Sequence, residues 1–185
     1  MSSPRRVNKG PAAAAENRAA LLEAARGAFA AHGLNVPLSL IAREAGVGQG
    51  SLYRHFPNRE AIILAVFREN IEQLEALAAD VDSTLDELLD QIFQQMTTVT
   101  PLFDSLAGAD LSDSRLTEVI GRLYGLLGEK LADETRRGSI RADATAEEIF
   151  LAVGMLGALL NRTPEDQRAT IADKSWQLLL RSLRR

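Results

Sequence analysis

The chain has 185 residues, a formal net charge of −4 and 46% hydrophobic residues, a composition typical of a globular protein with one domain or two small ones. Cysteine is absent and only two histidines are present, His32 and His55. Disulfides, thiolate metal sites and a cysteine nucleophile are therefore excluded, and we expect neither a metal nor a cofactor.

Charge is distributed unevenly along the chain. Residues 1–59 hold eight basic and three acidic residues, a net charge of +5, whereas residues 60–185 hold 13 and 22, a net charge of −9. This asymmetry predicts a basic head that meets a polyanion and an acidic body that does not. Chance clustering of charge is the alternative.

We expect a cytoplasmic protein that does not enter a membrane. The first 15 residues lack the apolar core of a secretion signal. The longest apolar run, from Ile149 to Leu160, has twelve residues, fewer than the roughly 18 needed to cross a bilayer. This run is therefore expected to be buried in protein.

Apolar residues recur at three- and four-residue spacing throughout, which predicts an all-α fold of about nine helices. Asn58 is a candidate N-cap, and Gly33 and Gly138 are candidate helix stops. The expected helices cover residues 16–32, 37–45, 49–56, 58–80, 83–99, 101–107, 114–137, 145–161 and 164–184. They suggest a flexible basic arm (1–15), a three-helix head (16–62) and a helical body (63–185).

The second and third expected helices are short, and the turn Gly46-Val47-Gly48 joins them, as in a helix-turn-helix. In the third helix, Leu52 and Phe56 lie four residues apart and are expected to point inward. The outward residues are then Gln49, Ser51, Tyr53, Arg54 and His55, all able to hydrogen-bond a base edge or a phosphate. This helix is therefore predicted to enter the major groove of DNA.

The head resembles the DNA-binding region of the TetR (tetracycline-repressor-like) family over about 45 residues. The positions that match in register are Arg18, Ala24-Ala25, Phe29, Gly33, Ile41-Ala42, Ala45-Gly46-Val47, Gly50-Ser51-Leu52-Tyr53, His55-Phe56 and Arg59-Glu60. The resemblance implies a dimeric transcription regulator, most often a repressor, that releases DNA when a small molecule occupies its second domain.

The resemblance also implies roles for single positions. Tyr53 and His55 match residues that contact phosphates, and Arg59 stands where the family most often has lysine. Two departures are Val36-Pro37, where the family usually has Thr-Ser, and Gly48, where it usually has Ser. The predicted DNA-binding set is Arg43, Gln49, Gly50, Ser51, Tyr53, Arg54, His55 and Arg59. The alternative roles are a core aromatic for Tyr53, a structural residue for His55 and a solvated charge for Arg43. The N-terminal arm either reaches DNA or makes no contact with it.

The body offers two further candidate sites. Phe67, Phe93, Met96, Phe103 and Tyr124 either line a pocket for a small-molecule effector or belong to the core. The run 149–160 is apolar on nearly every side, so a second subunit is expected to cover part of it. The predicted dimer interface is Phe150, Val153, Gly154, Gly157, Leu160, Trp176, Leu179, Leu180 and Leu183. A monomer that buries this run within one subunit is the alternative.

The sequence thus predicts a homodimeric, sequence-specific DNA-binding regulator, a repressor that a small-molecule effector releases from a near-palindromic operator. The two copies of the third helix are expected about 34–36 Å apart, in successive major grooves. The alternative is a helical protein-interaction module with a vestigial helix-turn-helix. An enzyme is not expected, because no carboxylate pair or nucleophile–base set stands out in the sequence.

Overall fold

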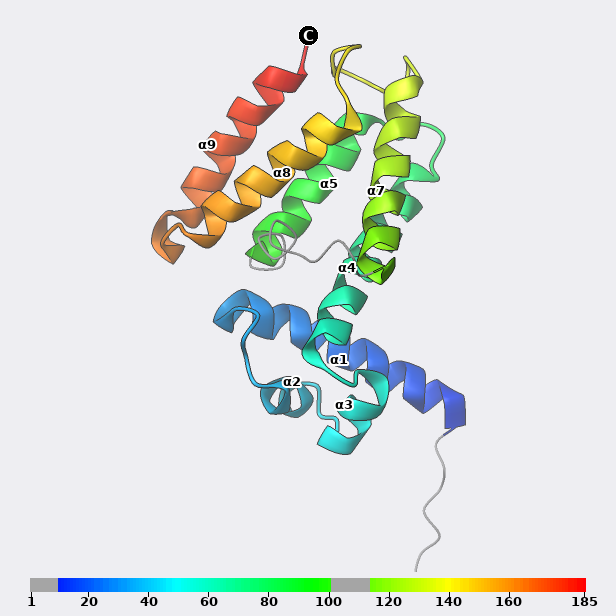
Figure 1. The fold of residues 1–185 in the computed structure, drawn as a ribbon, viewed down its shortest axis with the longest axis vertical. Coiled ribbons are helices and arrows are strands. Elements are labelled where there is room, and N and C mark those ends of the chain that lie inside the picture. Colours follow the sequence, from blue (N-terminus) through cyan, green and yellow to red (C-terminus); the bar gives the residue numbers. More distant parts are fainter. Residues whose placement is uncertain (1–9, 101–113) are drawn as a thin grey trace, which may run out of the picture. The chain divides into compact units, whose positions relative to one another are not determined.

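The computed structural model describes residues 10–100 and 114–185, which form eight α-helices and, within these ranges, no strand beyond an isolated bridge between Ile140 and Arg184. The helices are α1 (Gly10–His32), α2 (Leu38–Glu44), α3 (Gln49–His55), α4 (Arg59–Ala78), α5 (Leu85–Thr98), α7 (Ser114–Ala132), α8 (Ala146–Asn161) and α9 (Glu165–Leu183) (Figure 1). The predicted all-α fold is confirmed. The helix expected over 101–107 lies outside the described residues.

Most helix ends lie within two residues of their predicted positions, and two differ. Helix α1 begins at Gly10 rather than at 16, because the alanine run that precedes Glu16 has high helix propensity. Helix α7 ends at Ala132 rather than at 137. The Asp133 carboxylate accepts the backbone N–H groups of Thr135 (2.9 Å) and Arg136 (3.3 Å), and this turn competes with the helix.

The chain divides into two compact units, Met1–Ile62 and Ile63–Arg185, and the division falls inside α4. In the first unit, α1, α2 and α3 pack on one another around a small core. The core side chains, none more than 2% exposed, are Leu21, Leu22, Ala25, Ala28, Phe29, Ile41, Ala42, Leu52 and Phe56. Each large apolar side chain buried in this way contributes about 1.5–3 kcal/mol.

The connections around α3 depend on backbone geometry and packing. Gly46 has a φ of +64°, a left-handed conformation that glycine adopts without strain, and it forms the turn between α2 and α3. Pro37 precedes α2 and Gly48 precedes α3, and neither provides a side-chain hydrogen bond to its helix. By contrast, the Asn58 Oδ1 accepts the N–H of Ala61 (2.9 Å), which confirms the predicted cap of α4.

The core of the second unit comes mainly from α4, α5, α8 and α9. On α5, Leu85, Leu88, Leu89, Ile92 and Met96 are buried, and the neighbouring Phe93 ring stacks on Trp176 of α9 (4.9 Å between centroids). Helix α8 packs on α7 and α9. Its inward residues are Ile149, Val153, Leu156, Gly157 and Leu160, a set at helical spacing.

Polar contacts tie α4 and the residues that follow it to α7. Two nitrogens of the Arg122 guanidinium donate to the two oxygens of the Glu75 carboxylate, at 2.7 and 2.5 Å. Lys130, only 1% exposed, donates from Nζ to the backbone and hydroxyl oxygens of Ser83. Burial lowers the pKa of Lys130, since water no longer stabilises the ammonium group.

The Glu75–Arg122 pair makes the stability of this unit depend on pH. The hydrogen bonds from Arg122 lower the pKa of Glu75 below its ordinary value of 4.5, so the stabilisation is present above pH 4.5 and is lost as the pH falls through the folded-state value. Glu75→Gln should therefore lower the free energy of unfolding at pH 7, and the difference from the parent should shrink in acid. Because the carboxylate is more than a third exposed, we expect about 1 kcal/mol or less.

Urea unfolding of the parent and of Glu75→Gln at pH 7, 4.5 and 3 measures this difference. The matched control is Glu129→Gln, which removes an exposed carboxylate of α7 outside the pair. A difference between parent and Glu75→Gln that stays constant over this pH range would contradict the assignment.

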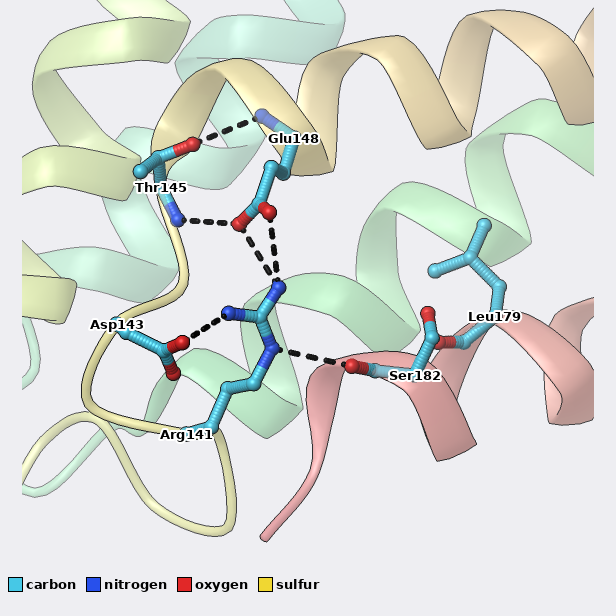
Figure 2. Close-up of polar contacts among 6 residues, drawn as sticks. All are labelled: Arg141, Asp143, Thr145, Glu148, Leu179 and Ser182. Atoms are coloured by element: carbon cyan, nitrogen blue, oxygen red, sulfur yellow. Dashed lines mark hydrogen bonds and ion pairs between the residues drawn. The ribbon is translucent and has the colours of Figure 1, made fainter.

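Arg141 joins the loop after α7 to the start of α8 and to the end of α9 (Figure 2). Its guanidinium contacts the Asp143 carboxylate (3.0 Å) and both oxygens of Glu148 (2.9 Å each), and its Nε donates to the backbone oxygen of Ser182 (3.1 Å). Glu148 also forms a capping box with Thr145 at the start of α8. The first turn of α8 and the last turn of α9 are thereby held to one side chain.

Candidate nucleic-acid interface

Helix α3 presents a polar face on the surface of the first unit. Its apolar residues Leu52 and Phe56 are buried, at 1% and 2% exposure, and hold the helix against α1 and α2. Gln49, Gly50 and Arg54 are exposed. The remaining predicted residues of this helix are Ser51 and His55, which are half-buried, and Tyr53, which is 53% exposed. Tyr53 is therefore not a core aromatic.

The C-terminal end of α3 is fixed by aromatic contacts. The Arg18 guanidinium carbon lies 5.5 Å from the centre of the Phe56 ring, a cation–π contact between α1 and the residue that ends α3. The His55 ring is tilted by 48° against that of Phe56, with 6.3 Å between centroids. These contacts fix the direction in which α3 projects its exposed side chains.

Arg59 has a structural role that sequence reasoning missed. Its Nη1 donates to the backbone oxygens of Leu34 and Val36 (2.5 Å for Val36), and the residue is half-buried. These bonds hold the connection between α1 and α2 to the start of α4. The sequence gives no local signal for contacts between residues 23 and 25 positions apart, and a phosphate contact from Arg59 stays a prediction.

Two open hollows flank the start of α3. One is lined by Asn17 of α1, the turn Gly46–Gly48, and Gly50, Ser51 and Arg54. The other is lined by Pro37, Ser39, Leu40, Ala42, Arg43, Val47 and Gln49, so the exposed Arg43 and Gln49 share one surface between α2 and α3. No acidic side chain lines either hollow, and each contains a guanidinium. This surface therefore suits a polyanion.

The predicted effector residues lie mostly in the core of the second unit. Phe67 and Met96 are buried, Phe93 stacks on Trp176, and the Tyr124 ring lies 5.1 Å from that of Phe150. Phe103 lies outside the described residues. These contacts explain the four described side chains as packing, and an effector role for them stays a prediction.

The predicted dimer residues are largely covered by their own protomer, and their place in a dimer interface stays a prediction. Val153, Leu160, Trp176, Leu180 and Leu183 are at most 7% exposed, Gly157 is buried, and Phe150, Gly154 and Leu179 are half-buried. The exposed apolar side chains on α8 and α9 are instead Leu151, Met155, Leu159 and Leu178. Hydrophobic periodicity did not separate these faces, because α8 is apolar nearly all round.

A family model for bacterial regulatory proteins of the tetR family matches residues 21–66. A TetR transcription regulatory protein from Mycobacterium vanbaalenii is 30% identical over 94% of this chain and 98% of that chain, with a TM-score of 0.65. This chain belongs to the TetR family. The resemblance found in the sequence is therefore confirmed, and this TetR-family member is a DNA-binding transcription regulator with α2 and α3 as its helix-turn-helix.

Other solved structures are similar to this TetR-family chain. A TetR transcriptional regulator from Streptomyces coelicolor is 30% identical over 90% of this chain and 98% of that chain (TM-score 0.58). A structure described as a gamma-butyrolactone receptor is 24% identical over 94% of this chain and 90% of that chain (TM-score 0.56), which shows a shared fold. A comparison with curated proteins found no match. No helix in the described ranges is long and apolar enough to cross a membrane.

Proposed function

We propose that this TetR-family regulator is a repressor that binds a near-palindromic operator as a homodimer and leaves it when a small molecule occupies the unit Ile63–Arg185. The exposed polar face of α3 carries this proposal. Arg54, Tyr53 and Gln49 project from a helix whose opposite side is buried, so they can enter a major groove without disturbing the core.

Direct base contacts and phosphate contacts have different roles at this face. Arg54 and Gln49 have side chains that can pair bidentately with guanine and adenine, respectively. Tyr53 and Arg43 are exposed donors on the same two helices, suited to the flanking phosphates. In this proposal phosphate contacts set the position of the dimer, and the groove-facing side chains select the sequence.

The exposed apolar side chains of the second unit support a homodimer. Leu151, Met155 and Leu159 recur every four residues along one face of α8, and Met155 is 70% exposed. Such a stripe is costly in water and is covered when a second copy packs on it. A two-fold axis through this contact would present two copies of α3, which must lie about 34–36 Å apart to reach successive major grooves.

Release by an effector requires unequal affinity of the effector for two arrangements of the dimer. Helix α4 runs continuously from one unit into the other, so a change in its direction changes the spacing of the two α3 copies. The name of the gamma-butyrolactone receptor among the similar structures supports a small molecule as the trigger.

Selection of duplexes from a random pool by the full-length protein, followed by titration at several salt concentrations, tests this function. We expect an enriched, near-palindromic sequence, and log K falling linearly with log[salt], with a slope of about −0.9 for each phosphate neutralised. If no duplex is enriched, or if affinity hardly changes with salt, the protein-interaction module becomes the better interpretation.

A further inference from the structure

The hollow beside α3 includes a residue of α1 that the predicted DNA-binding set lacks. Asn17 is half-buried on α1 and lines the same hollow as Ser51 and Arg54 of α3. Residues that carry an amide, a hydroxyl and a guanidinium, from two helices, therefore line one open space. All three groups donate hydrogen bonds.

Glycines keep this hollow open. A Cβ atom placed on Gly46, Gly48 or Gly50 would meet no heavy atom within 4 Å, so the space beside each of them is empty of protein. No acidic residue lines the hollow. An extended anionic chain can therefore approach the backbone here more closely than it could past larger side chains.

We propose that this hollow seats a phosphate of the operator backbone, with Asn17 and Ser51 as neutral donors and Arg54 as the neighbouring positive charge. A phosphodiester fits this set better than a base edge, because Asn17 belongs to α1 and not to the recognition helix that enters the groove. The inference rests on the proposed function and adds α1 to the DNA contacts.

Charged substitutions at position 17 test whether this hollow binds a phosphate. Asn17→Asp and Asn17→Lys are compared in the full-length protein with Ala19→Asp and Ala19→Lys, which introduce the same charges on the opposite side of α1 at an exposed position. The probe is the duplex that the parent protein selects from a random pool, titrated at several salt concentrations.

We expect Asn17→Asp to weaken binding by about tenfold or more. Asn17→Lys should increase the salt slope by about 1.8, because each protomer of the dimer adds one phosphate contact and each contact contributes about 0.9. The Ala19 variants should shift both quantities much less, because position 19 lies on the opposite side of α1 and does not line the hollow. Equal shifts at positions 17 and 19 would overturn the inference.

Gly50→Ala provides a second measurement that separates folding from binding. Alanine is a better helix former than glycine, so the thermal midpoint should stay the same or rise, while the added methyl group in the hollow weakens duplex binding several-fold. Unchanged binding by Gly50→Ala would count against the seat. If the parent protein binds no duplex, both the proposed function and this inference fail. If the parent binds a duplex but the variants at positions 17 and 19 behave alike, only this inference fails.

Discussion

Replacing Tyr53 and Arg54 together with alanine is expected to weaken binding to the selected operator by about 100-fold or more. A bidentate arginine–guanine contact contributes about 1–3 kcal/mol of discrimination, and a symmetric dimer loses it twice. Both side chains are exposed, so the fold should not change. Fluorescence anisotropy of a labelled duplex measures the loss.

The control for this prediction is a double variant on another exposed helix face, Lys174→Ala with Arg181→Ala, which removes two cations from α9. It should bind the duplex nearly as the parent does. Parent-like affinity of the Tyr53/Arg54 variant, with circular dichroism showing an intact fold, would mean that α3 does not read the operator.

Met155→Lys is expected to convert the dimer into a monomer. In the proposed interface the exposed Met155 packs against a second copy, and two lysines brought together across a two-fold axis would be buried without partners, at a cost of several kcal/mol. Within the protomer the same substitution costs little, because the side chain is 70% exposed. Sedimentation equilibrium should then give a mass near the 20.1 kDa of one chain.

Ala132→Lys is the matched control, since it places a lysine at an exposed apolar position at the end of α7, and it should remain dimeric. A monomeric parent would contradict the homodimer itself. A dimeric Met155→Lys protein would instead show that the exposed stripe on α8 is not the interface.

Amphipathic spacing predicted the helices and the recognition face well, because each short helix of the head has one clear apolar side. Leu52 and Phe56 are buried as their four-residue spacing predicted, and Tyr53 between them is exposed. The same reasoning does not separate the two sides of α8, where the run 149–160 has no polar residue to mark the outer side. Val153, predicted for the dimer interface, is buried within its own protomer.

Contacts between residues far apart in the chain, and local turns that compete with a helix, cannot be predicted from helical spacing. The Asp133 turn ends α7 with bonds that helix propensity does not describe, and Arg59 is bound by carbonyl oxygens far from it in the sequence. No local sequence pattern marks Asn17, because its neighbours across the hollow lie about 30 residues or more away in the chain.

The uncapped start of α3 has an evolutionary consequence. Gly48 provides no side-chain hydrogen bond to α3, and the buried Leu52 and Phe56 hold the helix against the rest of the head. The outward-facing residues of α3 therefore contribute little to the stability of the fold. Substitutions at Gln49, Ser51 and Arg54 can therefore accumulate with little structural penalty. Relatives of this regulator are free to acquire new target sites by exchanging these few side chains while the rest of the molecule stays as it is.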